Sequence, residues 1–327
     1  MSTNQPLQSD SIKRIGVLGA GQMGAAAAVM FRRAGYEVTL WARRAEALKC
    51  VEGTLSAVDA FLDQNFGVLT TPRGTLQCTT DLAAVDASAD AMLECIAEDM
   101  AQKHAFLRQL TSARERGALV MTCTSALSIT ELAAGSGMES VLVGAHFWNP
   151  PHLIPVVEII GGKDTPPAQV ERAMQLMKRL GKIPVLCADV PGFIGNRLQH
   201  ALWREALAMV DSGVCSAQDI DQVVKWTFAL RLPALGPMEN MDLVGLNLVE
   251  SVERYLFPHL ASNATPAEAL TTRLNAGESG MKAGRGFYDW TQRDAAETVA
   301  LRDRQIVRQL QFLREQGVFD SPNASGS

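Results

Sequence analysis

The sequence lacks the features that would tie the chain to a membrane or a nucleic acid. It has no uninterrupted apolar run of the about 18 residues that a membrane helix requires, and its first ten residues have neither the basic nor the apolar region of a secretory signal. Its 30 Lys and Arg are outnumbered by 35 Asp and Glu, so no positive field is available to hold a phosphate backbone. We therefore expect neither a membrane nor a nucleic acid as partner.

Cysteine is scarce and gives no sign of a disulfide framework or a metal site. The six cysteines lie far apart and include no C-x-x-C pair, which is the spacing typical of zinc sites. Reduced thiols of this kind are typical of cytosolic proteins. We therefore expect a cytoplasmic protein that holds no metal and acts on a small molecule.

The chain is long enough for two domains, the first of them of the α/β class. It has 327 residues, of which 47% are hydrophobic and 20% charged, an ordinary globular composition. Between residues 11 and 190, short apolar runs alternate with longer stretches of helical periodicity, which predicts a doubly wound, mostly parallel sheet of the Rossmann type. The expected strands are 15–18, 38–41, 91–96, 119–122, 141–145, 156–160 and 183–187, and the expected helices are 22–34, 45–64, 99–116 and 167–180.

Residues 191–320 are expected to form a second, all-α domain. Strand-like runs stop after Pro191, and apolar residues recur at helical spacing from Ile194 to Val210. Further helices are expected over 217–227, 241–256 and 294–316. The predicted fold class is therefore an α/β Rossmann-type domain followed by an all-α domain.

A glycine-rich turn follows the first expected strand. Residues 19–24 read GAGQMG, which is the G-x-G-x-x-G pattern placed between a strand and an alanine-rich helix. In this pattern Gly19 allows the tight turn, Gly21 lets the backbone approach a pyrophosphate, and Gly24 lets helix and strand pack closely. We therefore expect the backbone and side chains of the turn to bind a dinucleotide, through Gly19, Gly21, Gln22, Met23 and Gly24.

The residues after the second expected strand indicate which dinucleotide binds. Proteins that bind NAD commonly carry an acid there, which accepts a hydrogen bond from the ribose 2′-hydroxyl. Here Ala42 stands at that place, and Arg43 and Arg44 follow, whose guanidinium groups suit a 2′-phosphate. NADP is therefore favoured over NAD. The alternative is a solvated arginine pair beside a less specifically bound NAD.

Two expected strands flank a proline-rich reversal between residues 146 and 158. If the chain folds back around His152, His146 and Glu158 stand opposite each other. A glutamate that holds one imidazole N–H leaves the other ring nitrogen free to act as a base. Either residue alone would more often be structural, so it is their pairing behind a dinucleotide fold that indicates catalysis.

These motifs and several others resemble the 3-hydroxyacyl-CoA dehydrogenase family over nearly the whole chain. The shared segments are the 19–24 turn, Thr122–Leu127, His146-Phe147 with Asn149-Pro150, Glu158, Pro191–Arg197, Gly236-Pro237 with Asp242–Leu246, and Lys282–Tyr288. The resemblance implies a nicotinamide-dependent oxidoreductase of fatty acid metabolism that transfers a hydride to or from the 3-hydroxy carbon. It also implies a homodimer formed by the helical domain.

The resemblance assigns further site residues. It implies that His146 and Glu158 form the catalytic pair, that Ser125 contacts the substrate hydroxyl, and that Asn196 helps to polarise the carbonyl. It implies as well that Glu98 steadies the cleft and that Lys103 contacts the cofactor. Each has a simpler interpretation, because serine and asparagine commonly cap turns and helices and charged residues mostly lie on surfaces.

The substrate is less clearly indicated than the reaction. Family members that act on CoA thioesters look basic after the second strand, whereas residues 45–65 here hold four acids and a single base, Lys49. The 149–155 loop is also similar to that of relatives that oxidise free L-gulonate, L-carnitine or pyridine carboxylates. A dehydrogenase of a free 3-hydroxy acid or small polar alcohol is therefore an alternative. A dinucleotide-binding structural protein similar to a crystallin is an alternative of another class.

Overall fold

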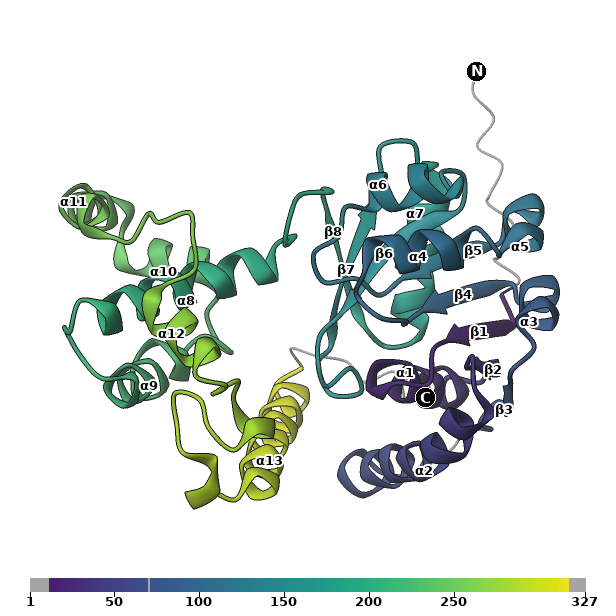
Figure 1. Cartoon of the computed structure of the whole chain (residues 1–327), viewed down its shortest axis with the longest axis horizontal. Coiled ribbons are helices and arrows are strands. Elements are labelled where there is room, and N and C mark those ends of the chain that lie inside the picture. Colours follow the sequence, from purple (N-terminus) through teal and green to yellow (C-terminus); the bar gives the residue numbers. More distant parts are fainter. Residues whose placement is uncertain (1–11, 70, 318–327) are drawn as a thin grey trace. The chain divides into compact units, whose positions relative to one another are not determined.

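The computed structural model describes residues 12–69 and 71–317, which form two compact units (Figure 1). The first unit comprises the described residues up to Asn196 and those from Leu310 onward. The second unit comprises Arg197–Gln309. This division differs from the expected limits, 11–190 and 191–320, at the junction and at the C-terminal end. Residue 11 and residues 318–320 of those limits lie outside the described residues.

The first unit is built on one sheet of eight strands in the order β3-β2-β1-β4-β5-β6-β7-β8. All neighbours are parallel except β6 and β7, which are antiparallel. The expected mostly parallel sheet is therefore confirmed. The strands are β1 (Arg14–Leu18), β2 (Glu37–Trp41), β3 (Leu76–Thr79), β4 (Ala91–Glu94), β5 (Leu119–Thr122), β6 (Leu142–Phe147), β7 (Val156–Gly161) and β8 (Ile183–Cys187).

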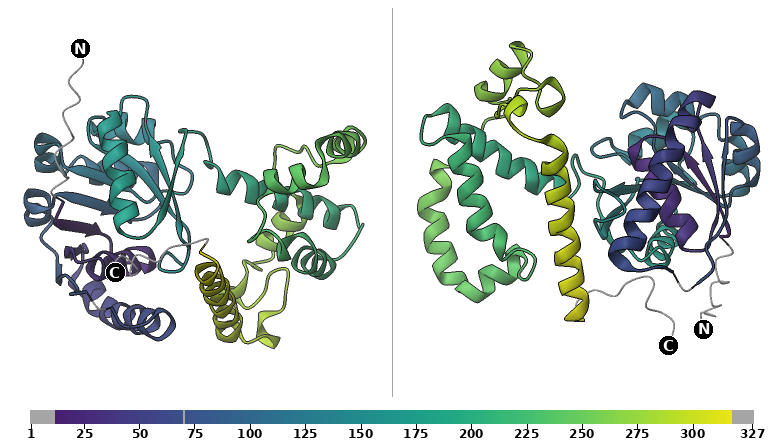
Figure 2. Two further views of the ribbon diagram at one scale, coloured as in Figure 1. Left: turned by 180° about the vertical axis from the view of Figure 1, so that it is seen from behind. Right: turned by 90° about the horizontal axis from the view of Figure 1, so that it is seen from below.

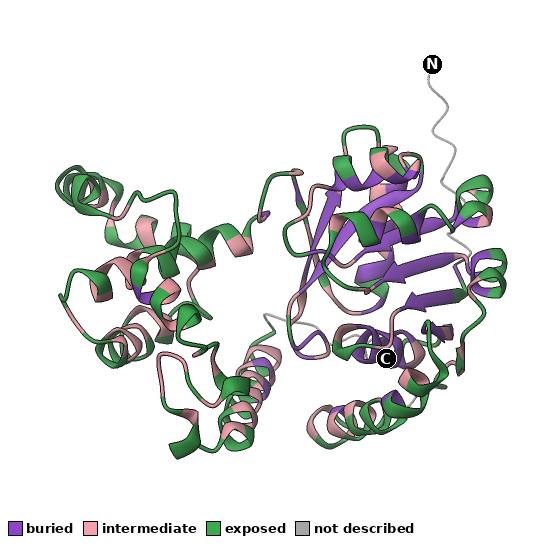
Figure 3. Ribbon diagram, in the orientation of Figure 1, coloured by how far each residue is buried: buried purple, intermediate pink, exposed green. Residues whose placement is uncertain are grey.

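Helices cover both faces of this sheet, as a doubly wound fold requires. The apolar core of one face takes side chains from α1, α2 and α7, and that of the other face from α3, α4, α5 and α6. The central strands between them are buried along their whole length (Figure 3). The helices are α1 (Gln22–Arg33), α2 (Ala45–Phe66), α3 (Leu82–Ser88), α4 (Met100–Leu107), α5 (Thr111–Arg116), α6 (Ile129–Ser136) and α7 (Pro167–Arg179).

Four features of this unit differ from the sequence prediction. The single helix expected over 99–116 is divided into α4 and α5, because the buried carboxylate of Asp86 accepts the backbone N–H groups of Ser112 and Ala113 and so begins a new helix there. Strand β3 and helices α3 and α6 were not expected. β3 is a short strand at the edge of the sheet without fully buried residues, so it leaves no apolar run in the sequence.

The second unit is helical, and all strands of the described residues lie in the first (Figure 2). Gly245, with a left-handed φ of 99°, divides the helix expected over 241–256. Within the described ranges, no helix is both long and apolar enough to cross a membrane. The helices are α8 (Gly195–Asp211), whose first two residues belong to the first unit, α9 (Ala217–Trp226), α10 (Pro237–Val244), α11 (Leu246–Leu256), α12 (Glu268–Asn275) and α13 (Ala295–Glu315).

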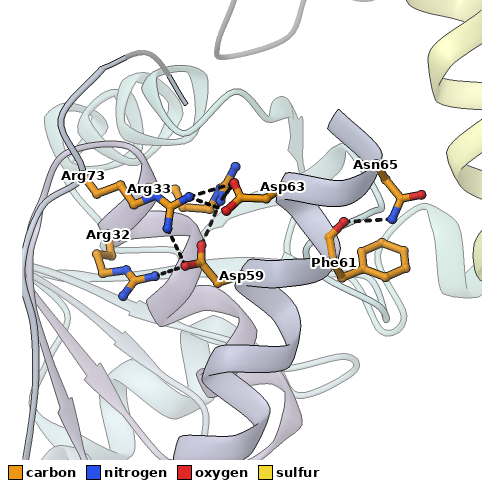
Figure 4. A network of polar contacts seen from close by, with 7 residues as sticks. All are labelled: Arg32, Arg33, Asp59, Phe61, Asp63, Asn65 and Arg73. Carbon is orange, nitrogen blue, oxygen red and sulfur yellow. Dashed lines mark hydrogen bonds and ion pairs between the residues drawn. The ribbon is translucent and has the colours of Figure 1, made fainter. Parts of the chain in front are cut away.

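An ionic network fixes α2 to α1 beside the sheet edge (Figure 4). Arg33 of α1 donates to Asp59 and Asp63 of α2, at 2.8 Å each, and Arg73 donates to the same two carboxylates at 2.6 to 2.7 Å. Arg32 also donates to Asp59. Two of the four acids that the sequence places in the 45–65 stretch are thus neutralised within the fold.

Replacing Asp59 with alanine is expected to destabilise the first unit. The substitution removes carboxylate partners from three arginines, of which Arg33 is only 8% exposed, so the free energy of unfolding should fall by about 3 kcal/mol. Urea unfolding measures this change. Glu52→Ala, which removes an exposed acid from the same helix, should change the free energy by less than about 0.5 kcal/mol, and an equal effect of both variants would contradict the role of the network.

Candidate active site

The glycine-rich turn has the geometry that a dinucleotide site needs. Gly19 has φ 127°, and a Cβ there would lie 2.6 Å from the Cys95 carbonyl oxygen. A Cβ on Gly24 would lie 1.9 Å from the Gly19 oxygen, so the helix can approach the turn only without a side chain. Gly21, by contrast, has open space where its side chain would be. The turn is therefore closed on its protein side and open where a pyrophosphate would approach.

The first turn of α1 points its backbone N–H groups toward this opening. Among the described residues no side chain caps the helix at Gly21, and its first turn contains no acid. Gln22 is exposed and Met23 half-buried. The residues present thus fit a dinucleotide phosphate, since helix N-terminal amides and the helix dipole favour an anion.

The end of β2 lies beside the same turn. The Gly19 amide donates to the Trp41 carbonyl oxygen at 2.9 Å, which places the following residues next to the turn. Ala42 is 4% exposed, whereas Arg43 and Arg44 are exposed. The two guanidinium groups are therefore available to a ligand on the adenosine side of the turn.

His146 and Glu158 face each other across the antiparallel pair β6 and β7, as the chain reversal predicted. They are register partners, and His146 Nδ1 lies 2.6 Å from Glu158 Oε2. Both residues are buried, at 4% and 3% exposure. Because Nδ1 is held by the carboxylate, Nε2 is the nitrogen left for proton exchange with a substrate.

The second oxygen of Glu158 is held by the backbone where α8 begins. The amides of Ile194 and Gly195 donate to Oε1 at 2.9 and 3.0 Å. Burial raises the pKa of Glu158, but the Gly195 amide, the His146 hydrogen bond and the Ile194 amide together outweigh it and lower the pKa below its ordinary value. The carboxylate therefore stays ionised near neutral pH and can stabilise a protonated imidazole.

Ser125 and Asn196 lie together, and Ser125 is held in turn by Glu98. Glu98 Oε1 accepts the Thr124 hydroxyl at 2.6 Å and the Ser125 amide at 2.8 Å. Asn196 Nδ2 donates to the Ser125 carbonyl oxygen at 2.8 Å. Ser125 remains exposed at the carboxyl end of β5, the edge where open α/β sheets bind ligands. Glu98 thus fixes the turn that presents the Ser125 hydroxyl.

Lys103, which the resemblance assigns to the cofactor, lies inside the fold. Its side chain is fully buried, and its ammonium donates to both carboxylate oxygens of Glu94, at 2.7 and 2.8 Å, and lies 3.7 Å from Glu98 Oε2. Glu94 also accepts the Thr122 hydroxyl at 2.6 Å. Lys103 is therefore an internal partner of a buried acid. The sequence does carry a signal for this pair, since an acid that ends an apolar strand needs a nearby cation.

Several contributors to the site could not be assigned from the sequence. The Ile194 and Gly195 amides belong to the backbone, so residue type does not reveal them. Asn149 accepts a hydrogen bond from Gln22 Nε2 at 3.4 Å and so links the loop after His146 to the glycine-rich turn. Thr124 matters through its hydroxyl contact with Glu98, which depends on two loops meeting in space.

Family models match most of the chain. The NAD binding domain of 3-hydroxyacyl-CoA dehydrogenase matches residues 14–190, and the C-terminal domain of the same enzyme matches residues 192–290. Together the two matches exceed half of the chain, and they follow its α/β and helical parts in order.

Curated relatives cover the same length. A 5-formyl-3-hydroxy-2-methylpyridine 4-carboxylate 5-dehydrogenase of Mesorhizobium japonicum is 30% identical over 90% of this chain and 96% of its own. An L-carnitine dehydrogenase of Streptomyces griseus is 31% identical over 98% and 92%. A 3-hydroxybutyryl-CoA dehydrogenase of Mycobacterium tuberculosis is 32% identical over 86% and 100%.

A solved structure agrees with these relatives. The crystal structure of the 5-formyl-3-hydroxy-2-methylpyridine 4-carboxylic acid 5-dehydrogenase, described as an NAD⁺-dependent dismutase, is similar with a TM-score of 0.88 at 30% identity. The similarity covers 93% of this chain and 99% of the other. The chain therefore belongs to the 3-hydroxyacyl-CoA dehydrogenase family of oxidoreductases.

Proposed function

We propose that this protein transfers a hydride between a nicotinamide dinucleotide and the 3-hydroxy or 3-keto carbon of a 3-hydroxyacyl substrate. The observation that carries the proposal is the buried pair of His146 and Glu158, joined at 2.6 Å on the register of two antiparallel strands. A structural dinucleotide-binding protein, the alternative of another class, has no use for a base held by an ionised carboxylate.

In this proposal each side chain has a separate role. In the oxidation direction His146 Nε2 removes the hydroxyl proton, and in reduction it returns that proton. Glu158 stabilises the imidazolium and keeps Nδ1 protonated. Ser125 binds the substrate oxygen, and Asn196 helps to polarise the carbonyl. The nicotinamide, when bound, supplies or accepts the hydride.

The two candidate substrates differ in whether the acyl group is joined to CoA or is a free acid. Asp59 and Asp63 are neutralised by arginines, but Glu46 and Glu52 remain exposed on α2, and Lys49 is the only base of that helix. The remaining charge disfavours the 3′-phosphate of CoA at this helix. This observation favours the second candidate, a free 3-hydroxy acid or small polar alcohol. The named substrates of the relatives include both kinds.

Oxidation of NADH or NADPH with acetoacetyl-CoA and with free acetoacetate, side by side, tests the proposal. Turnover of the thioester supports the 3-hydroxyacyl-CoA activity, and turnover of the free acid alone supports the second candidate. No turnover with either of them, or with a wider panel of free β-keto acids, would contradict both and favour a structural role.

We predict tighter binding of NADP(H) than of NAD(H). The buried Ala42 offers no acceptor for a 2′-hydroxyl, and the exposed Arg43 and Arg44 can meet a 2′-phosphate. Nicotinamide fluorescence titrations with both cofactors measure the difference, which the Arg43→Ala/Arg44→Ala variant should abolish. Equal or better affinity for NADH that this variant leaves unchanged would contradict the prediction.

We also predict a homodimer formed by the helical unit. Its first helix, α8, exposes Leu198 at 60%, Leu202 at 42% and Trp203 at 47%, and closed two-fold assemblies are the commonest oligomers. Light scattering at micromolar concentration should give about twice the chain mass of 35.3 kDa. Leu198→Glu/Leu202→Glu should return the monomer mass, and a monomeric parent protein would refute the assembly.

The wide cysteine spacing remains our reason to propose a cytoplasmic location.

A further inference from the structure

The indole of Trp148 lies directly on the backbone of Gly195. A Cβ added to Gly195 would be 2.3 Å from Cζ2 of the indole and 3.1 Å from two more of its ring atoms. Gly195 is the first residue of α8 and is not among the glycines with a left-handed φ, so its backbone would accept alanine. Among the described residues, the indole is therefore what excludes a side chain at position 195.

Trp148 and Gly195 each contact one residue of the catalytic pair. The Trp148 ring lies 5.1 Å from the His146 ring, between centroids, at an interplanar angle of 52°. The Gly195 amide donates to Glu158 Oε1 at 3.0 Å. One side chain thus contacts the imidazole and, through Gly195, the backbone donor that holds the carboxylate.

A second aromatic ring, that of Phe193, lies beside the imidazole. Phe193 is 1% exposed, and its ring lies 5.8 Å from the His146 ring. It is the only non-glycine among the described residues with a positive φ, at 50°, a conformation that costs an L-residue of the order of 1 kcal/mol. The loop that begins α8 is therefore held in an unfavourable conformation that places its amides on Glu158.

The physical consequence concerns the orientation of the base. A general base is effective only in one geometry, and a displacement of about 1 Å can cost about 10²-fold in rate. The carboxylate of Glu158 fixes one atom of the His146 ring, but a single hydrogen bond leaves the ring free to tilt about it. Contact with the indole removes that freedom, because the indole in turn has no room to move toward Gly195.

We infer that Trp148 is a positioning residue of the dehydrogenation. Its indole packs against Gly195 and against the imidazole of His146, and so keeps His146 Nδ1 hydrogen-bonded to Glu158. The inference rests on the proposed function, since it requires His146 to be the base. It predicts that positions 148 and 195 are coupled: a side chain at 195 is harmful only while the indole is present.

A double-mutant cycle tests this coupling. Gly195→Ala should lower kcat by about 10²-fold while the affinity for the dinucleotide stays within about twofold, because the glycine-rich turn is unchanged. Trp148→Phe, whose ring is shorter, should cause a smaller loss. In Trp148→Phe/Gly195→Ala the rate should recover most of the way to that of Trp148→Phe. Gly53→Ala on α2, where nothing lies within 4 Å of the added Cβ, is the matched control and should keep the parent rate.

A spectroscopic readout separates positioning from loss of packing. The proton of the short bond between His146 Nδ1 and Glu158 Oε2 should give a low-field ¹H resonance, assigned by its absence in His146→Gln. Gly195→Ala should move it upfield or broaden it through exchange with water, and the double variant should restore it. If Gly195→Ala does not fold, Trp148→Leu replaces it as the test variant and should weaken the same resonance.

The inference is overturned if Gly195→Ala keeps the parent rate, if the two single losses multiply in the double variant, or if the resonance is the same in all folded variants. These results differ from failure of the proposed function. In that case His146→Gln itself would remain active, whatever the cycle shows.

Discussion

His146→Gln is expected to bind the dinucleotide as the parent protein does and to lose turnover by about 10²- to 10⁴-fold. Glutamine can fill position 146 on β6, but it cannot take up a proton at neutral pH. The loss should appear in kcat rather than in cofactor affinity, because the glycine-rich turn lies on another loop. Steady-state rates together with fluorescence titration of the cofactor measure the two quantities separately.

Glu158→Gln should also cost a large factor, for a different reason. The base remains, but the amide no longer fixes the Nδ1 proton, and the charge that stabilises the imidazolium is lost. Because His146 and Glu158 act as one unit, the double variant should be little slower than His146→Gln alone. If the two losses multiply instead, Glu158 acts elsewhere. A near-parent rate in His146→Gln would remove the mechanism.

Lys103→Met is expected to lower the free energy of unfolding by about 3–5 kcal/mol. The substitution leaves Glu94 fully buried without the ammonium that now contacts both of its oxygens. An isolated carboxylate in the core is costly, so the fold must either protonate it or open. Urea unfolding at neutral pH gives the size of the loss.

The matched variants make this prediction specific. Glu94→Gln/Lys103→Met should recover more than half of the loss, since the glutamine carries no charge. Its carbonyl oxygen can still accept the Ile96 amide, and its NH2 group can donate to the Thr122 hydroxyl oxygen. Lys163→Met, at an exposed site, should change stability by less than about 0.5 kcal/mol. Parent-like stability of Lys103→Met with weakened cofactor binding would return Lys103 to the cofactor site.

The parts of the fold that could be predicted are those with a strong local pattern. The turn at 19–24 combines glycine spacing with a strand before it and a helix after it, and Gly19 and Gly24 each have a steric reason in the structure. The pairing of His146 with Glu158 followed from the symmetry of the reversal around His152, because register fixes which residues face each other.

The parts that could not be predicted depend on residues far apart in sequence. The break between α4 and α5 is made by Asp86, more than twenty residues before it. The apolar strand that ends in Glu94 indicates that this acid needs a cation, but no local pattern shows that Lys103 supplies it. The amides of Ile194 and Gly195 and the seat of Trp148 on Gly195 depend on two loops meeting, which no local pattern records.

The central claim is that His146 exchanges a proton with the substrate while a hydride moves to or from the nicotinamide. A single-turnover reduction with nicotinamide carrying deuterium at the transferred position, run with the parent protein and with His146→Gln, tests it most directly. The account predicts product labelled at the carbinol carbon from the parent, and bound cofactor without labelled product from His146→Gln on the same time scale. Labelled product from His146→Gln at the parent rate would contradict it.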